Sequence, residues 1–266
     1  MEQKAALGRH GEPVVLTFLS YNIQAALGMS AYSHYLTKSW RHFIPDWRGI
    51  QRLDRIAKVL AGFDVVALQE VDGGSLRSSF VNQLAYFADL GRFPYHHQQL
   101  NRDLGRFGQF SNGLLSRLRP YQVDNHSLPG IRGRGAIVAR YGDPACPLVV
   151  ICVHLALSER ARFRQLHYLR EIIDGQEHVV MLGDLNCAAE LILDTPLRDA
   201  ALVHATHSHP TYPSWRPRRN IDHILASPSL AIQSVDVLPW VISDHLPIAV
   251  RLQIPADVAD GLRDNA

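Results

Sequence analysis

Short apolar runs recur along the chain, and polar side chains lie at one end of most of them. Continuous apolar runs of this kind are typical of strands that are buried on both faces of a sheet. The predicted strands are residues 14–21, 63–68, 112–116, 135–141, 149–154, 179–183, 221–226 and 247–252.

Other segments carry apolar side chains at helical spacing. The first such segment follows a possible N-cap at Asp46 and stops at Gly62, and a later one begins after Ser158 and stops at Gly175. Side chains like these cap helices, and glycine ends them. The predicted helices are residues 46–61, 78–90 and 158–174, with a further short helix beginning at Pro196.

Composition and charge indicate a globular chain. It has 266 residues, of which 47% are hydrophobic and 20% are charged, and no linker rich in Gly, Ser or Pro divides it. We therefore predict a single catalytic domain over residues 14–254, between a flexible N-terminus (1–13) and a flexible tail (255–266). The net charge of +2 is too small to indicate nucleic-acid binding by itself.

The first residues lack the apolar core of a signal peptide, and no run approaches the roughly 18 apolar residues that a membrane span needs. We therefore expect a cytoplasmic protein. The three cysteines, Cys146, Cys152 and Cys187, are odd in number and lack the spacing of a disulfide framework or a zinc–thiolate site.

Two side chains with hard oxygen atoms follow the predicted strand at 179–183. Asp184 and Asn186 lie one residue apart, and Mg²⁺ and Mn²⁺ prefer carboxylate and amide oxygens. Alone, this motif is more typical of a turn, because both side chains bond nearby backbone. Polar side chains lie beside four other apolar runs in the same way, at Asn22, Glu70, His154 and Ser243-Asp244-His245. This recurrence predicts that they form one site.

Two segments mix aromatic and basic side chains. The predicted insertion at 25–47 suits stacking on nucleobases or contact with a lipid surface, or else its aromatics pack on the domain. The loop 212–220 contains Trp215, Arg216 and Arg218 just before a predicted strand, which suits a phosphorylated substrate. Arg132 and Arg134 lie in a glycine-rich turn, and either arginine is a further candidate for holding a phosphate.

Seven motifs together give the chain a recognisable resemblance. They are SYNIQ, LQEVD, NGLLSR, VHLALSERARFRQL, GDLN, SWRPRRNIDHIL and SDHLP. In order and spacing the chain resembles the endonuclease/exonuclease/phosphatase superfamily over about residues 14–254. This superfamily of Mg²⁺-dependent phosphoesterases includes DNase I-like nucleases, AP endonucleases, inositol polyphosphate 5-phosphatases and bacterial sphingomyelinases. The resemblance implies a four-layer α/β sandwich, with two mixed β-sheets packed face to face and helices outside, and the predicted strands and helices agree with it.

The resemblance also implies roles for individual residues, which are those that match its motifs. The implied metal ligands are Asn22, Glu70 and Asp244. The implied catalytic residues are Asp184 as general base, Asn186 beside the water and phosphate, His154 on the phosphate, His245 at the transition state or leaving group, and Asp222 orienting His245. The substrate-binding candidates are Asn112, Arg134, Trp215, Arg216 and Arg218.

We therefore predict a hydrolase of phosphoester bonds, most simply a phosphodiesterase, that uses Mg²⁺ or Mn²⁺. The alternatives are a DNA or RNA nuclease, a phospholipid or inositol-phosphate phosphoesterase, and an inactive phosphate-binding module. The LQEVD motif continues with Val71-Asp72 where AP endonucleases have Thr-Lys, which favours the phosphatase and sphingomyelinase branches. The expected partner is a phosphorylated substrate, with peripheral membrane contact through 25–47 left open and no obligate protein partner expected.

Overall fold

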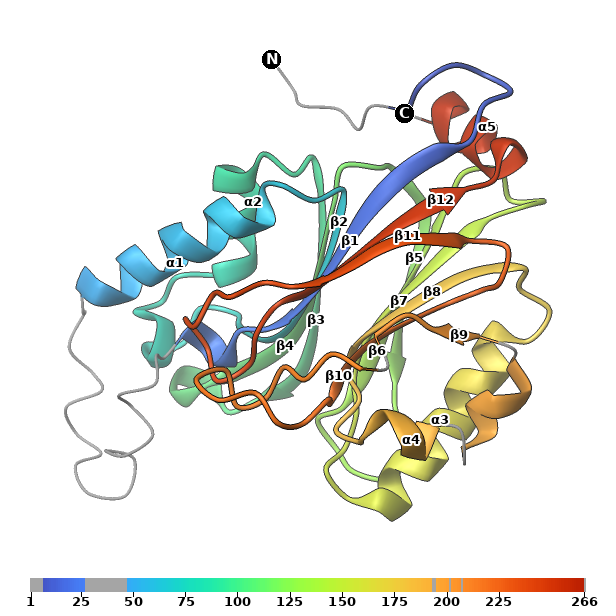
Figure 1. The fold of residues 1–266 in the computed structure, drawn as a ribbon. Coiled ribbons are helices and arrows are strands. Elements are labelled where there is room, and N and C mark those ends of the chain that lie inside the picture. The colour runs from blue at the N-terminus through green and yellow to red at the C-terminus, as the bar shows by residue number, and fades with distance from the viewer. Residues whose placement is uncertain (1–6, 27–46, 193–194, 201, 207, 266) are drawn as a thin grey trace.

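Two six-stranded β-sheets form the body of the protein (Figure 1). The computed structural model describes residues 7–26, 47–192, 195–200, 202–206 and 208–265. The strands are β1 (Val14–Asn22), β2 (Val65–Asp72), β3 (Tyr95–Asp103), β4 (Gln109–Ser116), β5 (Pro120–Ser127), β6 (Gly135–Tyr141), β7 (Leu148–His154), β8 (His178–Asp184), β9 (Val203–His204), β10 (Asp222–Ala226), β11 (Ala231–Val237) and β12 (Ile248–Ile254). One sheet has the order β11-β12-β1-β2-β4-β3 and the other the order β5-β6-β7-β8-β10-β9.

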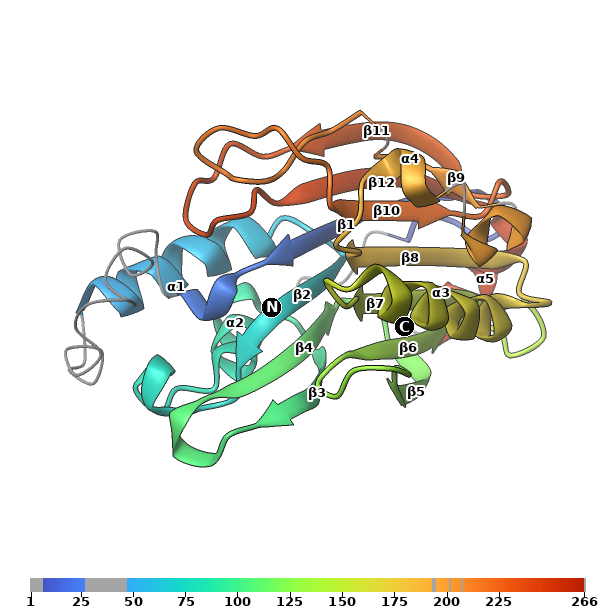
Figure 2. The same cartoon turned by 90° about the horizontal axis from the view of Figure 1, so that it is seen from below.

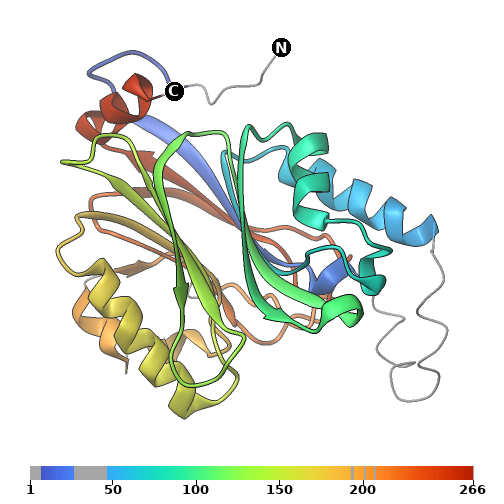
Figure 3. The same cartoon turned by 180° about the vertical axis from the view of Figure 1, so that it is seen from behind.

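Helices cover the outer face of each sheet (Figures 1 and 2). Helices α1 (Trp47–Leu60) and α2 (Gln83–Gly91) pack on the first sheet, and α3 (Glu159–Ile173) and the short α4 (Ala189–Ile192) pack on the second. The view from behind shows the two helical layers on opposite sides of the paired sheets (Figure 3). The predicted four-layer sandwich is therefore confirmed.

Alternate side chains of the central strands enter different layers. In β7, Val150 and Cys152 point into the core between the sheets, whereas Val149, Ile151 and Val153 join the cluster under α3. Successive side chains of a strand point to opposite faces, and helices or a second sheet cover both faces here. This arrangement explains why these strands are continuous apolar runs in the sequence.

Parallel pairs at the centre of each sheet bring polar strand ends together. β1 runs parallel to β2, and β7 runs parallel to β8. In the second pair the register sets His154 beside Asp184. Because parallel strands end at the same edge of a sheet, Asn22, Glu70, His154 and Asp184 all lie at one end of the sandwich.

The strands at the sheet edges have no counterpart among the predicted ones. These are β3, β5, β9 and β11. Their side chains are mostly exposed or half-buried, because an edge strand has a neighbour on one side only. Their sequences therefore lack the continuous apolar run that identified the central strands.

The described residues near both chain ends differ from the predicted flexible ends. Within the predicted tail 255–266, helix α5 (Ala256–Asp264) buries Val258 and Leu262 against the core between the sheets. Residues 7–13 lie beside this helix, since Arg263 donates to the carbonyl of Leu7 over 2.7 Å. The packing results from an amphipathic pattern too short to stand out in the sequence.

Most of the predicted aromatic and basic insertion, residues 27–46 of the segment 25–47, lies outside the described residues. Its first two residues, Ala25 and Ala26, are buried at the end of β1, and Trp47 begins α1. No helix within the described ranges is both long and apolar enough to cross a membrane.

Candidate active site

The carboxylate of Asp184, the last residue of β8, lies at the centre of the polar strand ends. Its Oδ2 atom lies 3.1 Å from Asn22 Nδ2, 3.5 Å from His154 Nε2 and 3.9 Å from His245 Nε2. These neighbours belong to β1, β7 and the segment before β12. Four segments far apart in the sequence therefore meet at one carboxylate oxygen.

The backbone before Asp184 requires glycine. Gly183 has a φ of +155°, and a Cβ atom there would lie 1.9 Å from the carbonyl oxygen of Val153. β7 and β8 approach each other closely at this point, which sets Asp184 beside His154. The next turn is held by the backbone N–H of Asn186, which donates to Asp184 Oδ1 over 2.9 Å, while the Asn186 amide donates to the carbonyl of Leu155.

Glu70 reaches the same place through a bulge in β2. The pairing of β2 with β4 shifts register between Leu68 and Val71, and Glu70 has a φ of +56°. Bulges re-aim side chains, and positive φ at a residue other than glycine is common at functional sites. The half-buried carboxylate of Glu70 lies 3.4 Å from Asn22 Nδ2, the same atom that donates to Asp184. The carboxylates of Glu70 and Asp184 therefore both contact the amide of Asn22.

His245 is held by a buried carboxylate. Its Nδ1 atom lies 2.8 Å from Oδ2 of Asp222, which sits opposite Asp184 in the pairing of β10 with β8. The same carboxylate oxygen accepts a hydrogen bond from the hydroxyl of Thr211. Burial alone lowers the pKa of His245, but the carboxylates of Asp222, Asp184 and Asp244 raise it to about 10. His245 is thus a cation whose Nε2–H faces Asp184.

His154 has the opposite electrostatic character. A guanidinium N–H of Arg134 lies 2.6 Å from His154 Nε2, and a guanidinium can only donate. Burial, Arg134 and His245 all lower the pKa of His154 well below its ordinary value, so the ring is neutral and Nε2 accepts. Its 3.5 Å separation from Asp184 is therefore not an ion pair. Arg134 itself interacts with the charges of Glu70 and Asp184, which places a cation beside the acidic groups.

The remaining substrate-binding candidates fall into two groups. Asn112 is buried in β4, where its amide donates to the carbonyl of Gly135, the residue paired with His154. Trp215, Arg216 and Arg218 are exposed on the loop that leads to β10. Asn112 can therefore support the backbone beneath the polar side chains of the site. The three loop residues can contact only a substrate that extends beyond these side chains.

Two residues to which the sequence assigned no individual role hold this loop in place beside Asp222 and His245. Thr211 bonds Asp222, and the ring of Tyr212 packs at 4.9 Å between centroids against His245. The backbone N–H of Ser214 donates to the carbonyl of Asp244 over 2.7 Å. Only the position of Tyr212 in an aromatic, basic loop pointed toward the site, and nothing local in the sequence distinguished Thr211.

The metal assignments differ in how much the geometry supports them. Carboxylate oxygens of Asp184 and Asp222 and a ring nitrogen of His245 lie within 4.8 Å of one another, and such a set could hold a metal ion. Asp222 Oδ2, however, already accepts from His245 and Thr211. The carboxylate of Asp244 lies 3.2 Å from the hydroxyl oxygen of Ser243, and its role as a metal ligand stays a prediction.

Glu70 and Asp184 offer carboxylate oxygens beside Asn22, and hard cations such as Mg²⁺ and Mn²⁺ prefer carboxylate and amide oxygens. The amide of Asn22 presents Nδ2 to both carboxylates, and its Oδ1 accepts from the N–H of Gln24 over 3.1 Å, so ligation by Oδ1 requires this amide to turn. Burial raises the pKa of Asp184, Asp222 raises it further, and His245 lowers it. A cation beside these acidic groups would favour the ionised form of Asp184.

Comparisons with known proteins identify the family of this chain. It belongs to the Endonuclease/Exonuclease/phosphatase family, which residues 19–245 match. The uncharacterized protein YbhP of Escherichia coli (strain K12) is 28% identical over 164 residues, which cover 55% of this chain and 64% of YbhP. The match therefore spans less than two thirds of that relative.

Solved structures share the fold. An endonuclease/exonuclease/phosphatase family protein from Bacteroides thetaiotaomicron has a TM-score of 0.71 at 18% identity, over 91% of this chain and 99% of that one. A mannosyl-6-phosphatase from the same species has a TM-score of 0.66 at 18% identity, over 89% and 99%. TDP2 of D. rerio, complexed with single-strand DNA product, has a TM-score of 0.61 at 16% identity, over 90% and 98%.

Proposed function

We propose that this protein is a Mg²⁺- or Mn²⁺-dependent phosphodiesterase in which Asp184 acts on the attacking water and His245 acts on the leaving oxygen. The observation that carries this proposal is the set of contacts around Asp184 Oδ2, where an amide, a neutral imidazole and an imidazolium lie within 3.9 Å. Hydrolysis of a phosphodiester needs a base for water, an acid for the leaving oxygen and positive charge around the phosphate.

The residues supply these functions as follows. Asp184 accepts a proton from the attacking water, whose oxygen forms a bond to phosphorus. The bond from phosphorus to the leaving oxygen breaks in line, and His245 Nε2 donates its proton to that oxygen. Asp222 holds the imidazolium through Nδ1, in the way that an acidic partner orients a catalytic histidine. Arg134 provides positive charge for the non-bridging oxygens.

Asn22 and Glu70 are the residues that would hold the divalent ion, beside the carboxylate of Asp184. When bound, such an ion neutralises charge on the phosphate and favours ionisation of the attacking water. We keep Asp244 as a candidate ligand because it follows Ser243, whose hydroxyl donates to the carbonyl of Asn22 over 2.8 Å.

A diester is favoured over a monoester by the exposed loop beside His245. Trp215, Arg216 and Arg218 lie on this loop, and a guanidinium or an indole there suits the second arm of a diester. The printed names of two structural neighbours, a mannosyl-6-phosphatase and a TDP2 bound to DNA product, support phosphoester chemistry and differ in the substrate.

The test is hydrolysis of bis-p-nitrophenyl phosphate and of p-nitrophenyl phosphate with Mg²⁺, with Mn²⁺ and with EDTA. We expect metal-dependent cleavage of the diester, and a fall in kcat of about 10²- to 10⁴-fold in Asp184→Asn and in His245→Gln. Asp174→Asn, a matched change at an exposed carboxylate, should retain full activity. A preference for the monoester would redirect the assignment to a phosphatase. Absence of turnover in a folded protein would leave a phosphate-binding module.

A further inference from the structure

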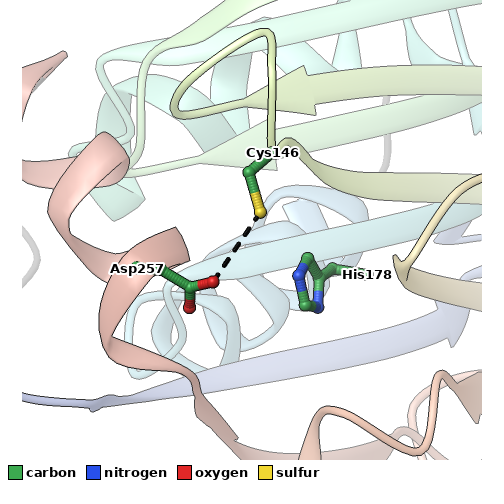
Figure 4. Close-up of side chains that lie close together, drawn as sticks. All are labelled: Cys146, His178 and Asp257. Atoms are coloured by element: carbon green, nitrogen blue, oxygen red, sulfur yellow. Dashed lines mark hydrogen bonds between the residues drawn. The ribbon is translucent and has the colours of Figure 1, made fainter.

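A second group of potential metal ligands lies at the end of the sandwich opposite the candidate active site. Cys146 lies in the turn between β6 and β7, His178 is the first residue of β8, and Asp257 lies in the first turn of α5. One ligand atom from each falls within 4.8 Å of the others, and Cys146 Sγ lies 4.0 Å from Asp257 Oδ2 (Figure 4). Along β8, His178 and Asp184 are separated by about 20 Å at the usual rise of a strand, so this group is separate from the active site.

The imidazole of His178 is buried, and one of its two nitrogens makes no hydrogen bond to the described residues. His178 is 3% exposed, its Nδ1 atom lies 2.8 Å from the hydroxyl of Ser229, and its Nε2 atom has no hydrogen-bond partner among the described residues. A buried polar atom without a partner is rare and calls for an explanation. Figure 4 shows the ring edge turned toward Cys146 and Asp257, so this nitrogen faces the other two groups.

The hydroxyl of Ser229 lies between His178 Nδ1 at 2.8 Å and the carbonyl of Glu177 at 3.2 Å. A carbonyl oxygen only accepts, so the tautomer of His178 with its proton on Nδ1 is the one that makes both hydrogen bonds with the single hydroxyl proton. This assignment leaves Nε2 as an unprotonated lone pair, which is how a metal-ligating histidine is usually held by its second partner.

The charges around Cys146 favour a cation. Burial raises the pKa of the Cys146 thiol, and the carboxylates of Asp257, Glu177 and Asp143 raise it further. A thiol in such surroundings is a poor nucleophile. The same negative charges attract a divalent ion, and binding of the ion would release the thiol proton.

We propose that Cys146, His178 and Asp257 bind a Zn²⁺ ion that fastens helix α5 to the starts of β7 and β8. Thiolate, imidazole and carboxylate are all ligands of Zn²⁺, whereas Mg²⁺ takes oxygen ligands only. With bonds of about 2.0 to 2.3 Å in a tetrahedron, neighbouring ligand atoms lie about 3.3 to 3.8 Å apart, so small side-chain rotations suffice. A water completes the fourth position.

The test is titration of the purified protein with Co²⁺, a spectroscopic substitute for Zn²⁺, in excess Mg²⁺ to occupy the active site. A thiolate ligand gives a charge-transfer band in the near ultraviolet that oxygen and nitrogen ligands do not give. We expect one equivalent of this band, its displacement by Zn²⁺, and its loss in Cys146→Ser. Cys187→Ser, at the thiol beside the active site, is the matched control and should keep the band.

Two further variants separate ligation from folding. Asp257→Asn, at an exposed carboxylate, should weaken Co²⁺ binding at least tenfold, and Ser229→Ala should weaken it about 10- to 100-fold by releasing the ring of His178. Zn²⁺ should also raise the Tm of the wild type and leave that of Cys146→Ser unchanged. A folded wild type without the band, or a band of equal strength in Cys146→Ser, would overturn the proposal.

Discussion

Arg117, the last residue of the NGLLSR motif, lies away from the active site and joins two helix ends. It is 8% exposed and follows β4 at the end of that strand where β2 begins. Its guanidinium donates to backbone carbonyls just after α1 and at the end of α2. The accepting residues are Ala61 (2.6 Å), Phe63 (3.1 Å), Gly91 (3.2 Å) and Arg92 (3.2 Å). These carbonyls belong to helix ends, which have no intrahelical partners and favour a cation.

The contacts allow the effect of Arg117→Met to be estimated. A hydrogen bond from a charged donor contributes about 1.5 to 3 kcal/mol, but four of them do not add, because some freed carbonyls regain water. The guanidinium also stacks 4.8 Å from the ring centroid of Phe93, an interaction worth about 0.5 to 2 kcal/mol. We expect a loss of about 3 to 5 kcal/mol in the free energy of unfolding, and about half of that for Arg117→Lys, whose ammonium cannot reach four carbonyls.

The assay is urea denaturation followed by circular dichroism, with phosphoesterase activity measured on the folded fraction. The midpoint should fall at an unchanged m-value, and activity per folded molecule should stay constant, since the site lies at the other end of the sheet. Arg119→Met, at an exposed arginine two residues away, is the matched control. A loss below about 1 kcal/mol in Arg117→Met, equal to that of the control, would refute the reasoning.

Three other substitutions test the packing of the site and of the C-terminus. Thr211→Val removes the hydroxyl that bonds the carboxylate of Asp222, which holds the imidazole of His245, and should lower kcat about tenfold at a constant KM; unchanged kinetics would exclude this positioning role. Gly183→Ala places a Cβ 1.9 Å from a carbonyl oxygen of β7, and should cost about 2 to 4 kcal/mol in thermal or urea unfolding, against a small effect for Gly62→Ala. Leu262→Ala should cost about 2 to 4 kcal/mol, whereas exposed Leu191 should tolerate alanine; equal effects would mean that α5 is not packed.

The sequence predicted the centre of both sheets but not their edges. Strands such as β6 and β7 are buried on both faces, so their side chains must be apolar at every position, and that run is visible without the fold. The edge strands β3, β5, β9 and β11 form because their backbone pairs with one neighbouring strand. Backbone hydrogen bonds carry no side-chain signature, so polar sequences such as that of β3 read as loops.

The candidate site divides in the same way. Polar side chains that end buried strands stand out locally, and this local pattern alone identifies Asn22, Glu70, His154 and Asp184. The chain itself therefore determines which groups occupy the strand ends. The local sequence does not determine that the hydroxyl of Thr211 bonds Asp222, the carboxylate that holds His245.

Only the tertiary structure decided the protonation states of the two site histidines and the grouping of the proposed zinc ligands. Whether a histidine is a cation or a neutral acceptor depends on charges contributed by other strands, as the contrast between His245 and His154 demonstrates. Cys146, His178 and Asp257 have no motif spacing, because the antiparallel pairing of β12 with β1 and the parallel pairing of β7 with β8 bring their three segments to one end of the sandwich. Spacing along a sequence reports ligands from one local segment, whereas packing assembles ligands from distant ones.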